Sequence, residues 1–334
     1  MPVGRVTSTE TPSAPLLTKI EFLAETYNQM GYQFRNLLTR NSRMPTERIY
    51  SWDTQGFQPI GSDSGRAPST RGNYMDITLS TPKPYGFSIQ VDRDFITRGG
   101  DPEVGMDRYR NAIAQDQLLQ SQLCVKAALS GSGYWANDGN IPPAYQGNTF
   151  LSTHTHYLGY SVSGSPLIAH VVDMIRHLEE HGLDKDRNDF VMMCNGKVLD
   201  RIKKLAEWVS EEPHMTNILE QLQQDGFTPA FRTMGVNWVK NDWIPDYYLW
   251  LQPMSYSQGP PMRSPLFPKD TAVSGVEDEI LGVFPHEPDR TFWLNVEFVR
   301  YAATPNVVWR SNGVVAYLNS GTYTAPSDSA LRLT

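Results

Sequence analysis

The sequence predicts an α+β fold, and three observations support that prediction. Residues 49–91 alternate apolar and polar side chains with the period of two that half-buried strands show. Residues 107–130 contain no glycine or proline and predict a single helix, roughly 36 Å long. Its apolar face is thin, so this helix is expected to lie along a surface rather than inside a bundle. After residue 165, helix-like and strand-like segments alternate, which is typical of a compact α/β unit.

Length and composition are those of a globular chain with room for two structural units. Of the 334 residues, 40% are hydrophobic and 19% are charged, so a sizeable core is expected and disorder is not. The net charge of -7, without a basic run, argues against a dedicated nucleic-acid-binding protein.

Two cysteines, Cys124 and Cys194, cannot build a disulfide framework, which favours synthesis in a reducing cytoplasm. Neither a secretory signal nor a membrane-spanning apolar run is present, so neither export nor membrane insertion is expected.

The N-terminal part of the chain predicts an arm, a helix and a long hairpin. Residues 1–16 are polar and aperiodic, so we expect an arm that is ordered only by packing on another surface. Apolar residues at three- and four-residue steps predict a helix over 17–41. Residues 50–92 predict a two-stranded hairpin with a polar tip at 61–72. Such a ribbon is marginal alone in water, so it needs another surface to lie on.

The remaining segments predict the α/β unit. A helix is expected over 165–182, because Ser-Pro is a typical helix start and glycine a typical end. The apolar run 190–194 predicts a central strand, and Asn195 is expected to cap a helix over 197–209. Further strands are predicted at 236–239, 247–251, 292–299 and 307–309, with a proline-rich loop over 252–268.

One helical motif fits an enzyme signature. His177, Glu180 and His181 match the H-x-x-E-H pattern of inverted zinc peptidases, in which the histidines share a helix face and the glutamate is the base. A polar helix face explains the motif better, because His181 directly precedes Gly182 at a helix C-terminus, where the dipole favours histidine. A zinc site also needs a third ligand. A metallopeptidase is therefore a minor alternative, and no catalytic residue is assigned.

Two further histidines could chelate a metal. His154 and His156 share one face if their segment is extended. They lie in a polar stretch without a nearby cysteine or carboxylate, so solvated histidines are expected. Glycine-containing stretches at 61–65 and 131–133 match neither a phosphate loop nor a nucleophile elbow. The sequence therefore predicts no enzyme, no metal and no cofactor.

The order of these elements is that of a subunit that tiles a closed shell. Residues 108–133 look like a spine helix with a small-residue turn, and 298–318 look like a closing strand. Residues 190–196 with 235–251 look like a strand, a turn at Asp242-Trp-Ile-Pro245 and another strand. In pattern and order the chain resembles the major capsid protein family of tailed bacteriophages (the Hong Kong ninety-seven type, or Johnson fold), a fold that bacterial encapsulins share.

This resemblance implies both a domain layout and a function. The implied layout is an N-terminal arm and helix at 1–49, an extended loop at 50–92, a peripheral domain at 93–164 and 299–334 with a spine helix at 107–130, and an axial domain at 165–298. The implied function is self-assembly into hexamers and pentamers of an icosahedral shell around the genome, in a virion made in the host bacterial cytoplasm. Implied partners are copies of the chain, a portal, and separate scaffolding and cement proteins. Contact with packaged DNA is expected to be weak and non-specific, and contact with a membrane is not expected.

Particular residues follow from the resemblance. Contacts between subunits are expected in the extended loop, at Trp52, Phe57, Arg66, Arg71 and Tyr74. Hinges between shell conformations are expected at Gly99, Gly100, Gly131 and Gly133. The tip at 61–72 holds no lysine, so the isopeptide bond that some family members form is not expected here.

Other functions remain as alternatives. An encapsulin-like cargo shell is the first, because it shares the fold, and an enzyme inside purified particles would identify it. The zinc peptidase is the second. A tail or baseplate protein is the third, and it would form tubes or rings rather than polyhedra.

Overall fold

The computed structural model describes most of the chain, in separate stretches. These are residues 38–42, 46–52, 72–81, 83–101, 104–139, 141–142, 148–164, 166, 168–184, 190–203, 228–253, 262–265, 282–286 and 291–333. They divide into two compact units: the first holds the described residues within 81–120 and 266–303, and the second holds those within 33–80, 121–265 and 304–334. No helix in the described stretches combines the length and the apolar character needed to cross a bilayer.

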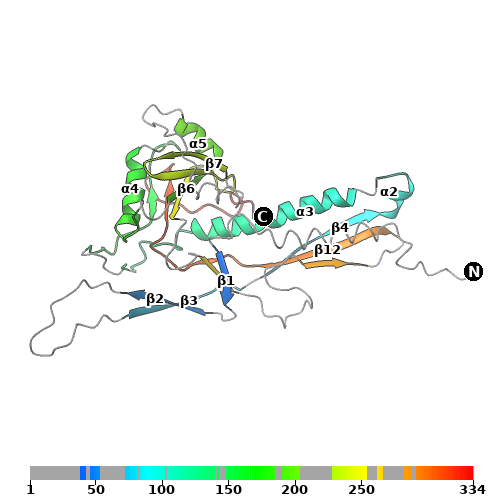
Figure 1. Cartoon of the computed structure of the whole chain (residues 1–334), viewed down its shortest axis with the longest axis horizontal. Coiled ribbons are helices and arrows are strands. Elements are labelled where there is room, and N and C mark those ends of the chain that lie inside the picture. The colour runs from blue at the N-terminus through cyan, green and yellow to red at the C-terminus, as the bar shows by residue number, and fades with distance from the viewer. Residues whose placement is uncertain are drawn as a thin grey trace, which may run out of the picture. The chain divides into compact units, whose positions relative to one another are not determined.

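A three-stranded antiparallel sheet forms the base of the first unit. Its order is β11-β12-β4 (Figure 1). The strands are β4 (Lys83–Asp92), β11 (Gly282–Pro285) and β12 (Phe292–Ala302). The short helix α2 (Arg93–Thr97) follows β4 directly, and the long helix α3 (Val104–Ala128) begins in this unit.

The core of the first unit follows from alternation along β4 and from one face of α3. Ile89 and Val91 are buried, whereas their neighbours at 88, 90 and 92 are exposed. Tyr109 and Ala112 of α3 join this core, and the Tyr109 ring lies 5.8 Å from the ring of Phe298. The predicted thin apolar face is therefore present here. Beyond it, residues 120–125 are buried on every side of the helix, so the expected surface position does not hold for that part of α3.

The second unit is built on a six-stranded mixed sheet in the order β5-β14-β9-β6-β8-β7. Its strands are β5 (Tyr157–Gly159), β6 (Phe190–Cys194), β7 (Thr228–Thr233), β8 (Val236–Lys240), β9 (Tyr248–Pro253) and β14 (Val314–Tyr317). Its helices are α4 (Ile168–Glu179) and α5 (Gly196–Lys203). The β5–β14 and β6–β8 pairs are parallel, and the other three are antiparallel.

Strand β6 shows why this sheet is stable within the chain. All five of its residues are fully buried, as predicted for a central strand. Alternate residues, at positions 190, 192 and 194, join one core cluster with the apolar faces of α4 and α5. The predicted cap is also present, because the Asn195 side chain accepts a hydrogen bond from the Val198 amide at 3.0 Å. Helix α5 is described to Lys203, and the rest of its predicted range lies outside the described residues.

Two smaller sheets complete the second unit. One has the order β1-β10-β13, with β1 (Leu38–Ser42), β10 (Met262–Pro265) and β13 (Asn306–Val307). The other is the ribbon of β2 (Thr46–Trp52) and β3 (Gly72–Thr78). The prediction of a helix as far as residue 41 is wrong at its end, because residues 38–42 form β1 and pair in parallel with β10. Backbone pairing with β10 makes this segment a strand despite the helical spacing of its apolar residues. Residues 17–37 lie outside the described residues.

Two strands pair differently from the sequence expectation. The predicted hairpin over 50–92 is confirmed for β2 and β3, but β4 pairs with β12 and belongs to the first unit. Strand β14 lies between β5 and β9 in the second unit, whereas the predicted layout grouped 299–334 with the peripheral domain. Val314, Val315 and Ala316 are fully buried, which suits the interior of a sheet covered on both faces. The axial and peripheral boundaries themselves stay a prediction.

Candidate functional site

The β2–β3 ribbon is the first candidate site, because it carries the predicted contact residues. The strands pair in antiparallel register from Thr46 opposite Thr78 to Trp52 opposite Gly72. In the described residues, neither strand pairs with any other. Trp52 and Tyr74 both lie on this ribbon, with Tyr74 opposite Tyr50. Phe57, Arg66 and Arg71 lie outside the described residues.

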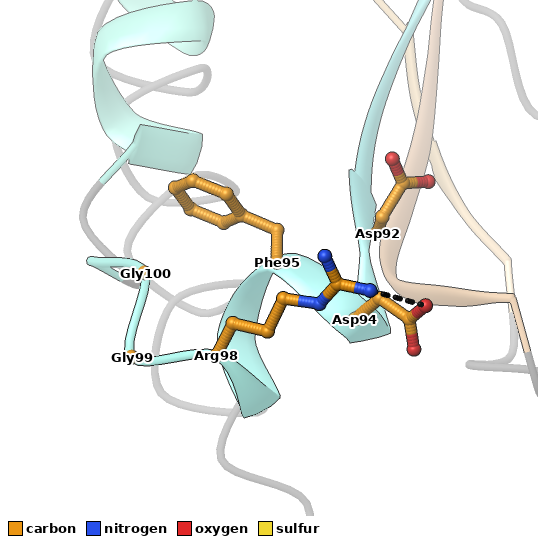
Figure 2. Close-up of a pocket in the computed structure, with 6 residues that line it drawn as sticks. All are labelled: Asp92, Asp94, Phe95, Arg98, Gly99 and Gly100. Atoms are coloured by element: carbon orange, nitrogen blue, oxygen red, sulfur yellow. Dashed lines mark ion pairs between the residues drawn. The ribbon is translucent and has the colours of Figure 1, made fainter.

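The glycine pair after α2 is the first predicted hinge. Gly99 has a φ of +87°, in the left-handed region where a side chain is strained. A Cβ on Gly100 would lie 2.4 Å from the Phe95 ring. Figure 2 shows Phe95 pointing toward the Gly100 side, while Arg98 reaches back along α2 to Asp94, 4.0 Å away. These residues line a hollow of about 530 Å³.

The second predicted hinge is a tightly packed turn. Gly131 has a φ of +83°, which again favours glycine. A Cβ on Gly133 would lie 2.7 Å from the Ala127 carbonyl oxygen, so no side chain fits there. The Ser130 hydroxyl donates to that same carbonyl at 3.0 Å and accepts from the Gly133 amide at 3.1 Å. The glycines are thus required by local geometry, and their role as hinges stays a prediction.

A buried ion pair crosses the first unit, and sequence reasoning missed it. Arg300 of β12 donates through Nε and Nη2 to the two Asp116 carboxylate oxygens, at 2.8 and 2.7 Å. Their side chains are 4% and 2% exposed. Gln120, one helical turn on, donates to the same carboxylate at 3.0 Å. The sequence contained a signal for this buried pair. Arg300 is two residues after Phe298, on the same strand face, and Asp116 is four residues after Ala112, on the buried helix face.

A polar network lies on the other face of the six-stranded sheet. Trp250 Nε1 donates to the Tyr134 hydroxyl at 2.9 Å, and that hydroxyl donates to Gln252. The Tyr157 hydroxyl accepts from the Tyr134 amide at 3.0 Å. A Cβ on Gly313 would overlap the Tyr134 ring at 2.2 Å, so glycine is required beside it. The network anchors the segment after α3 to β9.

A histidine cluster in the second unit is the strongest chemical site. His154 and His156 precede β5, and His181 follows the end of α4. The Nε2 atom of His154 lies 3.1 Å from His156 Nε2 and 3.1 Å from His181 Nε2. One ring nitrogen from each residue lies within 4.8 Å of the others. The expectation of solvated histidines is wrong for His156, which is fully buried.

Neighbouring groups hold the cluster in place. The Phe150 ring stacks on His181, with centroids 4.4 Å apart and planes 12° apart, and contacts His154 at 4.7 Å. The His156 Nδ1 lies 2.7 Å from the Gly313 carbonyl oxygen. Because a carbonyl only accepts, Nδ1 carries the hydrogen and Nε2 carries a lone pair.

The imidazoles of the cluster are neutral at pH 7. Burial lowers the pKa of His181 to about 3, and the nearby His154 and His177 add to the effect. Burial also lowers the pKa of His154, assisted by His177 and opposed by Glu180. The pKa of His156 falls well below its usual range, through burial first and His181 second. Neutral imidazole is the form that can coordinate a metal.

The three residues of the predicted peptidase motif have separate partners in the structure. His181 belongs to the cluster, but the partners that face its Nε2 come from the segment before β5 rather than from α4. His177 uses its Nδ1 to donate to the Asp173 carbonyl at 2.8 Å. The Glu180 carboxylate forms an ion pair with Arg176 at 3.2 Å. This arrangement does not match the roles that the motif would require.

Comparisons with known proteins identify the fold. No protein-family model matches the sequence, and no curated protein matches it. Solved structures do match. A structure from Mycobacterium phage Patience has a TM-score of 0.63 at 16% identity, covering 93% of this chain and 89% of that one.

A second match is the asymmetric unit of the bacteriophage PhiM1 mature capsid. Its TM-score is 0.53 at 11% identity, covering 86% of this chain and 87% of that one. The chain has the phage major capsid fold. At these identities the likeness is one of fold, and it confirms the predicted fold class.

Proposed function

We propose that the chain is the major capsid protein of a tailed double-stranded DNA bacteriophage. Its copies assemble into hexamers and pentamers of an icosahedral shell that encloses the genome. The observation that carries the proposal is the fold shared with the PhiM1 mature capsid over 86% of this chain. The chain is synthesised in the host bacterial cytoplasm and ends in the virion, and its role is structural rather than enzymatic.

The β2–β3 ribbon supports the proposal, because its two strands pair only with each other in the described residues. A two-stranded ribbon is marginal in water, and a neighbouring subunit supplies the surface that stabilises it. The contact residues are Trp52 and Tyr74 on the ribbon, with Phe57, Arg66 and Arg71 between the strands in sequence. Burial of aromatic side chains supplies most of the stabilising free energy of such contacts, at about 25 cal/mol per Å² of apolar area.

Two domains have separate roles in the proposed shell. The axial domain, residues 165–298, lies around the symmetry axes and includes strands β6 to β9 with helices α4 and α5. The peripheral domain, residues 93–164 and 299–334, includes the long helix α3. Gly99, Gly100, Gly131 and Gly133 are the hinges that allow one sequence to occupy non-identical positions.

Partners follow from the same proposal. Copies of the chain are the first, and a portal with separate scaffolding and cement proteins completes the shell. The net charge of -7 suits a container for DNA, because a strongly basic lining would bind the genome tightly. Contact with packaged DNA is therefore weak and non-specific.

Electron microscopy of the expressed full chain tests the proposal. Closed shells tens of nanometres across are expected, together with denaturing gels that show the 37.7 kDa monomer and no crosslinked ladder. A monodisperse monomer at high concentration would overturn the assignment, and tubes or rings would indicate a tail protein. An enzyme rather than DNA inside particles from infected cells would indicate a cargo shell.

A further inference from the structure

The ring nitrogens of the histidine cluster cannot all be satisfied by hydrogen bonds to one another, and this favours a cation between them. Since His156 Nδ1 donates to Gly313, His156 Nε2 offers a lone pair toward His154 Nε2, 3.1 Å away. The same His154 nitrogen also lies 3.1 Å from His181 Nε2. A neutral imidazole nitrogen carries either one hydrogen or one lone pair, so His154 Nε2 cannot form a separate linear hydrogen bond with each neighbour. A metal ion accepts lone pairs from all three nitrogens at once.

Two of the three ligand separations are close to those of a small tetrahedral centre. Zn–N bonds of about 2.0–2.1 Å place tetrahedral ligand atoms about 3.3–3.4 Å apart. The two shortest separations in the cluster are each 3.1 Å, and the third ligand atom lies within 4.8 Å. The His156 and His181 nitrogens lie within 4.8 Å of each other. The half-buried His181 side chain therefore moves by up to about 1.5 Å to bring all three nitrogens onto one tetrahedral ion.

The residues around the cluster also suit a metal. Metal-binding histidines usually donate their second nitrogen to a carbonyl or carboxylate, as His156 does to Gly313. The Phe150 ring covers His154 and His181 and limits their movement. Among the described residues, the group that could hold a metal consists of three imidazoles and no carboxylate. Imidazole ligands favour Zn²⁺ and similar transition metals over Mg²⁺ or Ca²⁺.

We propose that His154, His156 and His181 together bind one divalent transition-metal ion, with Zn²⁺ as the best match. A water molecule completes the coordination. The ion joins the segment before β5 to the end of α4, so its role is to stabilise the second unit. This inference stands on the cluster alone and does not depend on the proposed capsid function.

Metal binding by the purified full-length protein tests the site. After treatment with EDTA and dialysis, titration with ZnCl₂ is expected to give about one equivalent per chain, with Mg²⁺ unable to compete. The double variant His154→Ala/His181→Ala is expected to lose that equivalent. His170→Ala and His286→Ala are matched controls, because both histidines lie outside the cluster, and they should retain it. Equal zinc binding by the double variant and the wild type would overturn the proposal, as would an absence of binding to the wild type.

A variant that adds a spectroscopic signal distinguishes the loss of a metal ligand from the loss of the fold. His181→Cys keeps a metal ligand, so it should still bind Co²⁺ and should add a thiolate-to-cobalt charge-transfer band that the wild type lacks. The His170→Cys control should bind Co²⁺ without that band. Circular dichroism of each variant checks that the fold is kept. A folded His181→Cys protein that binds Co²⁺ without the new band would contradict His181 as a ligand.

Discussion

The six-stranded sheet and the β2–β3 ribbon belong to the same unit but are stabilised by different means. Every interior strand of the sheet has two paired neighbours, and β6 is fully buried between them. Each strand of the ribbon has one paired neighbour in the described residues. The comparison teaches that the sheet is stabilised by the chain itself, whereas the ribbon needs a second surface. Substitutions in the sheet should therefore change the free energy of unfolding, and substitutions in the ribbon should change assembly.

The largest loss of stability is expected from Trp238→Ala. Trp238 lies on β8, is fully buried and contributes to the core shared with α4 and α5. Removing a buried tryptophan side chain costs about 3–5 kcal/mol. Denaturant unfolding of the unassembled protein, followed by circular dichroism, measures this. Val172→Ala on the exposed side of α4 is the control, with an expected change of about 0.5 kcal/mol or less; a cost this small for Trp238→Ala would contradict the core assignment.

The next effect tests the first unit, where a buried charge pair crosses the core. Arg300→Leu leaves the Asp116 carboxylate buried without its guanidinium partner. We expect a loss of about 3 kcal/mol, at the low end of the range for such pairs, because Gln120 still donates to the carboxylate. Adding Asp116→Leu should recover most of this loss. If the double variant is as unstable as the single one, packing around Arg300 is the cause rather than the unpaired charge.

A smaller loss is expected at the turn that follows α3. Gly133→Ala places a Cβ against the Ala127 carbonyl, which costs about 1–3 kcal/mol of unfolding free energy. Gly99→Ala meets no neighbour and suffers only backbone strain at positive φ, about 1 kcal/mol. Thermal unfolding distinguishes the two variants. A lower cost for Gly133→Ala than for Gly99→Ala would show that the turn relaxes around the added methyl group.

The smallest change in stability, with the largest change in assembly, is expected in the ribbon. In the proposed shell, Trp52→Ala with Tyr74→Ala removes aromatic contacts to a neighbouring subunit. The unfolding free energy of the unassembled chain should change by about 0.5 kcal/mol or less, while the yield of closed shells falls. Sedimentation velocity and electron microscopy measure that yield. Normal shells from the double variant would remove these two residues from the proposed interface.

Local patterns predicted the elements whose contacts are local. The long helix, the central strand at 190–194 and the Asn195 cap are confirmed, because apolar periodicity and capping chemistry act within a few residues. The prediction of helix is wrong at 38–42, because Leu38 continues a helical spacing while the pairing partner β10 is distant in sequence. The same reason explains β4, whose partner β12 lies far along the chain.

In the candidate sites too, local features could be predicted from the sequence and contacts between distant residues could not. The glycines at the turns were identifiable, because a required φ or a close approach is a property of one position. The histidine cluster was not, because His154 and His156 meet His181 only after β5 and α4 have packed into one unit. Likewise, Asp116 is one polar residue among glutamines in the sequence, and only the fold brings Arg300 beside it.

The position of β14 has a consequence for biosynthesis. Its residues leave the ribosome after every other strand of the six-stranded sheet, yet it sits between β5 and β9. Until then, both of those strands present open edges, which are sites where nascent chains can aggregate. At about 5–20 residues per second, some seconds pass between the emergence of β9 and that of β14. A cell making this protein in quantity therefore gains from chaperones that cover these edges during translation.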